Sequence, residues 1–118
     1  MRQTPLALLC AIAAAAPAIA AEPPHPFSVH DMVAFERISE PQLDPAGSQI
    51  LYTLRTTDLE ANRGRFDLWT VAVGGGEPRR LTAHEATDNG GRWAPDGKSI
   101  FFLSTRSGST QVWRIPLA

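Results

Sequence analysis

The sequence predicts an all-β fold that is built from a repeated antiparallel sheet. From residue 41 onward, short runs rich in β-branched and aromatic residues follow one another, and turn signals that contain proline and glycine separate them. Two of these stretches, residues 41–55 and 91–106, are copies of one another. The first 40 residues have a different pattern, with an apolar run and a proline-rich segment.

The N-terminus has the features of a secretory signal peptide. Arg2 precedes an apolar run at residues 6–16, and Ala18 and Ala20 supply the small residues that signal peptidase requires. We therefore predict a signal peptide over residues 1–20, a periplasmic or secreted mature protein, and no membrane association after cleavage. The formal net charge of the 118-residue chain is -1, which gives no electrostatic reason to expect binding to nucleic acid.

Residues 21–40 are predicted to form a linker and a short lead-in helix. The segment begins with several prolines, which favour an extended linker. Ser28 and Asp31 have the spacing of a capping box at a helix start. The helix is expected to end before Pro41. Its apolar stripe is predicted from three residues at helical spacing: Met32, Phe35 and Ile38.

The repeat is typical of the blades of a β-propeller. Trp69 and Trp113 each lie at the centre of a further strand and are 44 residues apart, whereas the matching prolines are 50 residues apart. The first copy therefore holds six additional residues, which we place in the loop 56–66. Repeats of about 40 to 50 residues with several short strands indicate propeller blades. The two copies share a proline and a glycine, Pro45 with Pro95 and Gly47 with Gly97.

The residues after position 40 are predicted to be a partial propeller, 41–118. Blade one covers about residues 41–82, with glycines 74–76 leading into a short outer strand at 79–82. Blade two, about residues 90–118, has three strands and is incomplete. Because a propeller needs about four to eight blades, the chain is predicted to be the first one to two blades of a larger ring.

Turn chemistry explains the shared proline and glycine. In Pro95-Asp96-Gly97 the proline presets φ, the aspartate can bond to the backbone, and the glycine accepts a positive φ. The first copy has Ala46 where the second has Asp96, so a weaker first turn is expected. The three tryptophans are expected in the blade core: Trp69, Trp93 and Trp113.

The stretch Trp93-Ala94-Pro95-Asp96-Gly97-Lys98, followed by an apolar strand, resembles the propeller repeats of the prolyl oligopeptidase family of serine peptidases and of the periplasmic TolB protein. Residues 27–41 resemble the lead-in helix of bacterial secreted dipeptidyl or acylaminoacyl peptidases, and residues 57–65 resemble a loop of the same group. The resemblance to the peptidases implies a propeller that caps a C-terminal α/β-hydrolase domain and filters the access of peptide substrates. The alternative is a TolB-like periplasmic propeller that binds proteins and has no enzymatic activity.

No catalytic, cofactor-binding or metal site is predicted within the chain, which is expected to be inactive alone. It contains no Gly-x-Ser-x-Gly elbow. His84 and Glu85 begin a possible zinc motif, but Asp88 stands where the second histidine would be. Glycines 74–76 lack the following lysine of a phosphate loop. The remaining candidates for a triad are serines 104, 107 and 109 and histidines 25, 30 and 84.

Four arginines between residues 63 and 80 allow two interpretations of this surface. Asp67 and Glu77 lie between them in the sequence, and this mixture of charges favours an ordinary solvated rim. Alternatively, the longer loop of blade one gates the propeller or meets the hydrolase domain, since functional residues concentrate in loops on rigid scaffolds. The arginines concerned are Arg63, Arg65, Arg79 and Arg80.

Overall fold

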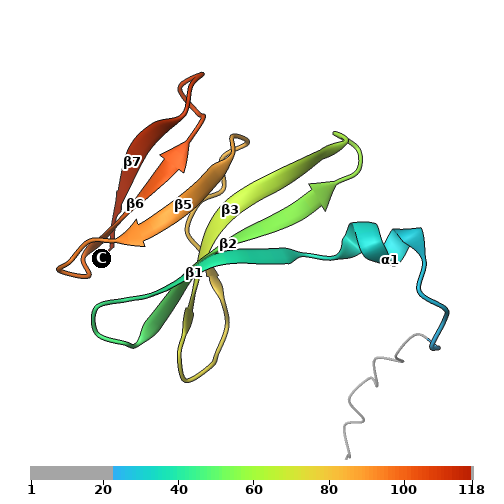
Figure 1. The fold of residues 1–118 in the computed structure, drawn as a ribbon, viewed down its shortest axis with the longest axis horizontal. Helices are drawn as coiled ribbons and strands as arrows, with labels where there is room; N and C mark the ends of the chain where they lie inside the picture. The colour runs from blue at the N-terminus through green and yellow to red at the C-terminus, as the bar shows by residue number, and fades with distance from the viewer. Residues whose placement is uncertain (1–22, 118) are drawn as a thin grey trace, which may run out of the picture.

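The computed structural model describes residues 23–117, in which one short helix precedes two antiparallel sheets (Figure 1). The predicted signal peptide, residues 1–20, lies outside the described residues. The all-β class is confirmed. In chain order the elements are α1 (Val29–Ala34), β1 (Arg37–Leu43), β2 (Gln49–Asp58), β3 (Arg63–Ala72), β4 (Arg79–Arg80), β5 (Asp88–Trp93), β6 (Ser99–Ser104) and β7 (Gln111–Pro116).

The capping box of α1 forms as predicted. The Oγ atom of Ser28 accepts a hydrogen bond from the Asp31 amide at 3.3 Å, and the Asp31 carboxylate accepts one from the Ser28 amide at 2.7 Å. The Ser28 hydroxyl also donates to the Asp31 carboxylate at 2.6 Å, and this hydrogen bond, followed by the one from the Ser28 amide, holds the pKa of Asp31 below its ordinary value. The start of the helix was therefore predicted correctly from two residues, Ser28 and Asp31.

The lead-in helix has six residues, and its apolar stripe is shorter than the sequence indicated. It ends at Ala34, because Phe35 is already extended, and Ile38 belongs to β1 instead of the helical stripe. A helix of six residues has little stability of its own, so pairing of Ile38 with Leu54 of β2 determines the conformation here. The first sheet therefore begins at Arg37, before the expected position 41. Pro41 is accommodated because it lies on an edge strand at a bulge.

Blade one is a four-stranded sheet with the order β1-β2-β3-β4, and blade two is a three-stranded sheet with the order β5-β6-β7. The β2–β3 hairpin pairs without interruption from Gln49 with Ala72 to Asp58 with Arg63. The outer strand β4 has only two residues, although the amides of Leu81 and Thr82 still donate to the Leu68 carbonyl. Each blade thus has the number of strands that the repeat predicted.

The two tight turns share a backbone conformation. Gly47 and Gly97 have φ values of 71° and 68°, in the left-handed region that favours glycine. In blade two, Asp96 accepts a hydrogen bond from the Lys98 amide at 2.9 Å. In blade one, the Asp44 carboxylate accepts from the amides of Ser48 and Gln49, at 2.6 and 2.8 Å. An aspartate two positions earlier therefore compensates for Ala46.

The apolar core lies between the two blades. Leu51 and Leu68 of blade one form one cluster with Ile100 and Phe102 of blade two. Trp93 packs against this cluster, as expected for a core tryptophan. Trp69 is half-buried outside the cluster, and Trp113 is 36% exposed. Because one cluster serves both sheets, each blade depends on its neighbour for burial.

Candidate functional site

The blades approach each other closely at Gly91 in β5. A Cβ atom at this position would lie 2.8 Å from Cδ2 of Leu51 and 3.1 Å from Cδ2 of Leu68. Real side chains do not tolerate such short contacts, so the absence of a side chain at Gly91 sets the spacing of the sheets. The contact between the blades is therefore tightly packed at this position.

A matching bulge interrupts the first strand of each blade. The β1–β2 register shifts between Ser39 and Gln42, and the β5–β6 register shifts between Asn89 and Arg92. Glu40 has a φ of 53° in the first bulge, and its equivalent in the second bulge is a glycine with a φ of 63°. A left-handed glutamate is conformationally costly, which directs attention to what its side chain does.

The side chain of Glu40 joins the blades. Its Oε2 atom accepts hydrogen bonds from the amide of Gly90 at 2.9 Å and from Oγ1 of Thr53 at 3.2 Å. Close by in sequence, the Gln42 carbonyl accepts from Nε1 of Trp93 at 3.2 Å. Blade one therefore contacts blade two through polar bonds as well as through the apolar core.

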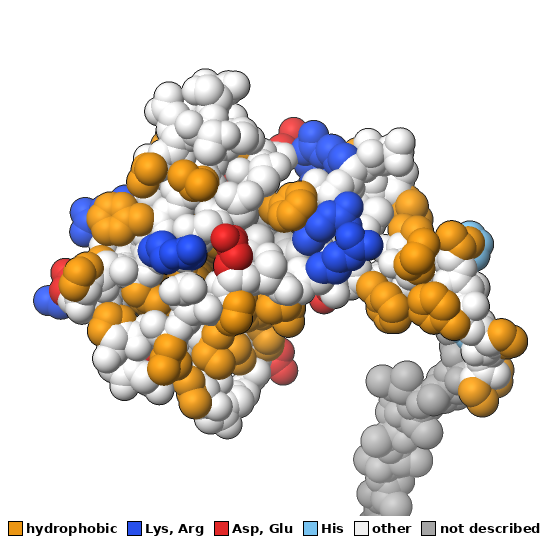
Figure 2. All heavy atoms as spheres, in the orientation of Figure 1, with side chains coloured by type: hydrophobic (Ala, Val, Ile, Leu, Met, Phe, Trp, Pro, Cys, Tyr) orange, Lys and Arg blue, Asp and Glu red, His pale blue; other side chains and the backbone are white. Residues whose placement is uncertain are grey.

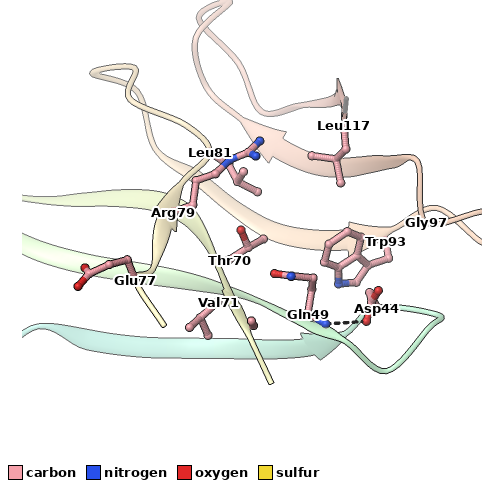
Figure 3. Close-up of a pocket in the computed structure, with 11 residues that line it drawn as sticks. Asp44, Gln49, Thr70, Val71, Glu77, Arg79, Leu81, Trp93, Gly97 and Leu117 are labelled. Atoms are coloured by element: carbon pink, nitrogen blue, oxygen red, sulfur yellow. Dashed lines mark hydrogen bonds between the residues drawn. The ribbon is translucent and has the colours of Figure 1, made fainter. Parts of the chain in front are cut away.

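A cleft of about 390 Å³ opens between the blades (Figure 3). Trp93 faces Gln49 and Thr70 across it, and Glu77 and Arg79 come from the segment that includes β4. Asp44 also lines the cleft, and hydrogen bonds from backbone amides, that of Gln49 first, lower the pKa of this carboxyl. The other lining residues are Val71, Ala72, Leu81, Gly97 and Leu117.

The lining of this cleft offers several groups that can bind a ligand. It combines an indole, an amide, a hydroxyl, one arginine and two carboxyl groups. The charged groups can pair with charges on a ligand, and the indole can stack on an apolar part of it. The cleft is accordingly a candidate binding surface at the junction of the blades.

A buried ion pair lies within blade two. Asp88 is fully buried, and its Oδ2 atom accepts from Nη2 of Arg106 at 2.7 Å, whereas its Oδ1 atom has no hydrogen-bond partner. The Arg106 guanidinium also lies 5.3 Å from the ring centre of Phe102 and 5.0 Å from that of Trp113. Sequence reasoning missed this pair, because it took Asp88 only as a failed zinc ligand.

The arginines singled out in the sequence are largely engaged within the chain. Arg65 pairs with Asp58 at 2.7 Å, and Arg80 pairs with Asp67 at 2.6 Å. Arg63 donates from Nη2 to the Glu85 carbonyl at 2.6 Å, so it ties the long β2–β3 hairpin to the connection between the blades. Arg79 lines the cleft.

The candidate triad residues lie apart in the fold. Ser104 is buried and accepts from Nε of Arg106, and Ser107 and Ser109 are exposed between β6 and β7. The Nδ1 atom of His84 accepts from the Ala86 amide at 3.0 Å. His25 lies 3.6 Å from the Asp31 carboxylate. Within residues 23–117, no hydrogen bond joins a histidine to a serine.

Two further properties concern only the part of the chain that the structure describes. Residues 23–117 contain no group of three or more His, Cys, Asp or Glu side chains that could hold a metal ion. Across the same residues, no helix has the length and apolar content needed to cross a membrane. The prediction that the chain lacks a catalytic site of its own stays a prediction.

Comparison with known proteins gives the family. No protein-family model matches the sequence. The chain is 31% identical over 80 residues to dipeptidyl-peptidase 5 of Porphyromonas gingivalis, covering 68% of the chain and 12% of that protein. It is 30% identical over 123 residues to dipeptidyl-peptidase 5 of Porphyromonas endodontalis, covering 95% of the chain and 18% of that protein. This chain corresponds to the N-terminal region of a prolyl oligopeptidase-family peptidase.

Solved structures show the propeller fold of this prolyl oligopeptidase-family region. Acylaminoacyl peptidase of Pyrococcus horikoshii aligns with 72% of the chain and 13% of its own length, with a TM-score of 0.58 and 22% identity. A TolB protein of Agrobacterium tumefaciens aligns with 63% of the chain and 24% of its own length, with a TM-score of 0.50 and 30% identity. The chain thus spans less than a quarter of each of these proteins and less than a fifth of the curated relatives.

Proposed function

We propose that the whole protein is an exported serine peptidase and that this region begins the propeller that filters peptide access to its hydrolase domain. The observation that supports the proposal best is the match to dipeptidyl-peptidase 5 over 95% of the chain. A match of that extent includes the lead-in helix as well as both blades. The TolB match extends over only 63% of the chain.

The packing between the blades suits a filter. A propeller excludes large substrates only if adjacent blades stay closed against each other, since gaps between blades would bypass the central channel. Here Gly91 allows the sheets to approach closely, and Glu40 and Trp93 add hydrogen bonds across the contact. These features favour a rigid wall with access along the channel.

In this proposal the chemistry belongs to the C-terminal α/β-hydrolase domain, outside the chain. A serine would attack the scissile carbonyl, a histidine would take its proton and pass it to the leaving amine, and an aspartate would orient the histidine. Short peptides are the proposed substrates. The signal peptide predicted at residues 1–20 supports a location in the periplasm or outside the cell.

The test uses the full-length gene product. We expect a fluorophosphonate probe to label a single serine outside residues 1–118, and we expect the protein to hydrolyse dipeptidyl amides much faster than intact folded proteins. Mass spectrometry of the exported protein should find Ala21 at its N-terminus. A full-length protein that no fluorophosphonate labels, or one that degrades folded proteins and short peptides equally well, would contradict the proposal.

A TolB-like protein-binding propeller is the second candidate. It is supported by the 30% identity to TolB and by the mixed polar and aromatic lining of the cleft between the blades. It predicts a full-length protein made of further blades, with no labelled serine. Its binding partners would then be sought among other exported proteins.

A further inference from the structure

One end of the cleft between the blades carries an arginine that forms no ion pair within residues 23–117. The strand β4 consists of two successive arginines, and Arg80 pairs with the buried Asp67 at 2.6 Å. Arg79 is exposed and lines the cleft instead. The ion pairs formed within residues 23–117 include neither Arg79 nor Glu77, which also lines the cleft. The Arg79 guanidinium is therefore available to a carboxylate from outside the chain.

The other end of the cleft carries a carboxylate and an indole that are both held in place. The Asp44 carboxylate accepts hydrogen bonds from the amides of Ser48 and Gln49 and from the Ser48 hydroxyl. The Gln49 amide first among them keeps the pKa of Asp44 below its ordinary value, so the group is ionised at neutral pH. Nε1 of Trp93 donates to the Gln42 carbonyl, which fixes the ring. An ionised carboxylate and an indole both attract a cation such as an ammonium group.

Hydrogen-bonding groups lie between these two ends. Figure 3 shows Thr70 and Gln49 between Arg79 on one side and Trp93 with Asp44 on the other. A hydroxyl and a side-chain amide can each bond to a peptide group. Along the cleft, a cation is thus followed by neutral polar groups and then by an anion. The apolar part of the lining includes Val71, Leu81 and Leu117.

The cleft lies at the rim where the tight turns gather. Asp44 belongs to the turn between β1 and β2, Glu77 to the connection between β3 and β4, and Gly97 to the turn between β5 and β6. The helix α1 lies toward the other rim, because Arg37 at the start of β1 pairs with Arg55 near the far end of β2. A ligand therefore approaches the cleft from the side of the turns.

The charge of the surface favours a ligand with few charges. Figure 2 shows Lys and Arg side chains in separate groups among apolar and acidic ones, without one continuous basic surface on this face. The chain has a formal net charge of -1. A polyanion such as nucleic acid needs an extended basic surface. Arg79 at one end and Asp44 at the other suit a ligand with one charge of each sign.

We propose that this cleft is a binding site for a short zwitterionic peptide, with the peptide carboxylate at Arg79 and the peptide ammonium at Asp44 and Trp93. Thr70 and Gln49 bond to the peptide group between the two charges. The volume of 390 Å³ lies in the lower part of the range of about 300 to 1,000 Å³ that is usual for ligand sites, which suits a peptide of a few residues. The site does not depend on the assignment of the whole protein as a peptidase.

The test is calorimetric titration of the dipeptide Leu-Phe into the full-length gene product, which is first treated with fluorophosphonate so that a labelled serine cannot hydrolyse the probe. We expect a Kd of about 1 mM or tighter. The amide of Leu-Phe lacks the carboxylate, and N-acetyl-Leu-Phe lacks the ammonium. Each should bind roughly tenfold more weakly or worse, because each loses a charged contact.

The variant Arg79→Gln locates the site. It should weaken the binding of Leu-Phe roughly tenfold or more and leave the weak binding of the amide unchanged, because the amide has no carboxylate to lose. Lys98→Gln is the matched control, since Lys98 is an exposed cation in a turn at the same rim and does not line the cleft. It should bind Leu-Phe like wild type. The melting temperature of each variant checks that it folds.

Three results would overturn the proposal. The first is absence of Leu-Phe binding, which includes the case of a cleft filled by another part of the full-length chain. The second is an equal affinity for Leu-Phe and its two blocked forms. The third is an Arg79→Gln variant that binds like wild type or like Lys98→Gln. Labelling by the fluorophosphonate tests the peptidase assignment separately, and the binding result stands whether or not a serine is labelled.

Discussion

Blade one and blade two follow the same backbone path but use different side chains to maintain it. The tight turn of blade one relies on Asp44, which accepts two backbone amides, whereas that of blade two relies on Asp96, which accepts one. At the bulge, blade one has Glu40 and blade two has Gly90. The two copies of the repeat therefore share a backbone conformation at the turn and at the bulge. Different side chains can stabilise or accommodate that same backbone conformation.

The blades also differ in how they neutralise buried charge. In blade two, Asp88 is fully buried, and Arg106 is its ionic partner. In blade one, Asp67 pairs with Arg80, whose side chain is 46% exposed, and the Oγ1 atom of Thr82 adds a hydrogen bond to the same carboxylate. The buried carboxylate of blade two thus has one side chain, Arg106, as its ionic partner. The carboxylate of Asp67 in blade one has two side-chain partners, Arg80 and Thr82.

The largest expected effect follows from that single ionic partner. Arg106→Met leaves the Asp88 carboxylate buried without its cation, and we expect a loss of about 3 to 5 kcal/mol in the free energy of unfolding. Urea unfolding of the full-length protein measures it. Arg65→Met is the control, because Arg65 and Asp58 are both partly exposed and the loss should be much smaller. Equal losses in the two variants would show that burial of Asp88 is not the cause.

The contact between the blades provides the next largest effect. Gly91→Val places a side chain against Leu51 and Leu68, and overpacking of this kind costs about 1 to 3 kcal/mol. Gly74→Ala is the control, since nothing lies within 4 Å of a Cβ atom there. In an active full-length protein, Gly91→Val should also raise the hydrolysis of long peptides relative to dipeptides. Stability unchanged from wild type would show that the sheets separate easily.

Substitutions at the two bulge residues, Glu40 and Gly90, should change the stability less than those above. Gly90→Ala should cost about 1 to 2 kcal/mol, because φ is positive there. Glu40→Gly should be nearly neutral, since relief of about 1 to 2 kcal/mol of backbone strain opposes the loss of two hydrogen bonds worth about 1 kcal/mol each. Glu40→Ala keeps the strain and loses both hydrogen bonds, so thermal unfolding should rank it below Glu40→Gly. The opposite ranking would mean that Glu40 is unstrained.

The smallest effect is a pH dependence in the first turn. The folded-state pKa of Asp44 lies below its ordinary value of 3.8, mainly because the Gln49 amide bonds to the carboxylate. Its contribution to stability is therefore present above pH 3.8 and is lost as the pH falls through the folded-state pKa. Asp44→Ala should lower the melting temperature at pH 7 and converge with wild type in acid. A constant difference at all pH values would contradict this assignment.

Local features of the fold were predictable from the sequence. The capping box, the two proline and glycine turns and the strands of each blade depend on residues a few positions apart, and their chemistry is expressed in short patterns. The repeat added the propeller class, because a copied pattern constrains all its elements together. The cleft between the blades followed from none of these patterns.

Features that join distant residues were not predictable. Glu40 accepts a hydrogen bond from Gly90 fifty residues later, and Asp88 accepts one from Arg106 eighteen residues later. A single sequence gives no signal for such pairs. Ile38 was assigned to the helix because its spacing fits one, but pairing with β2 outweighed that spacing. The conformation at Ile38 is thus decided by a strand that begins eleven residues later.

The core shared between the blades sets an order of events during synthesis. Leu51 must wait for Phe102, its partner in the shared cluster, to be added before its burial is complete. At about 5 to 20 residues per second, that interval lasts roughly 3 to 10 seconds. During this time the growing chain exposes an apolar sheet face that invites aggregation. A nascent chain of this kind is an expected client of chaperones that shield apolar surfaces until the second blade is made.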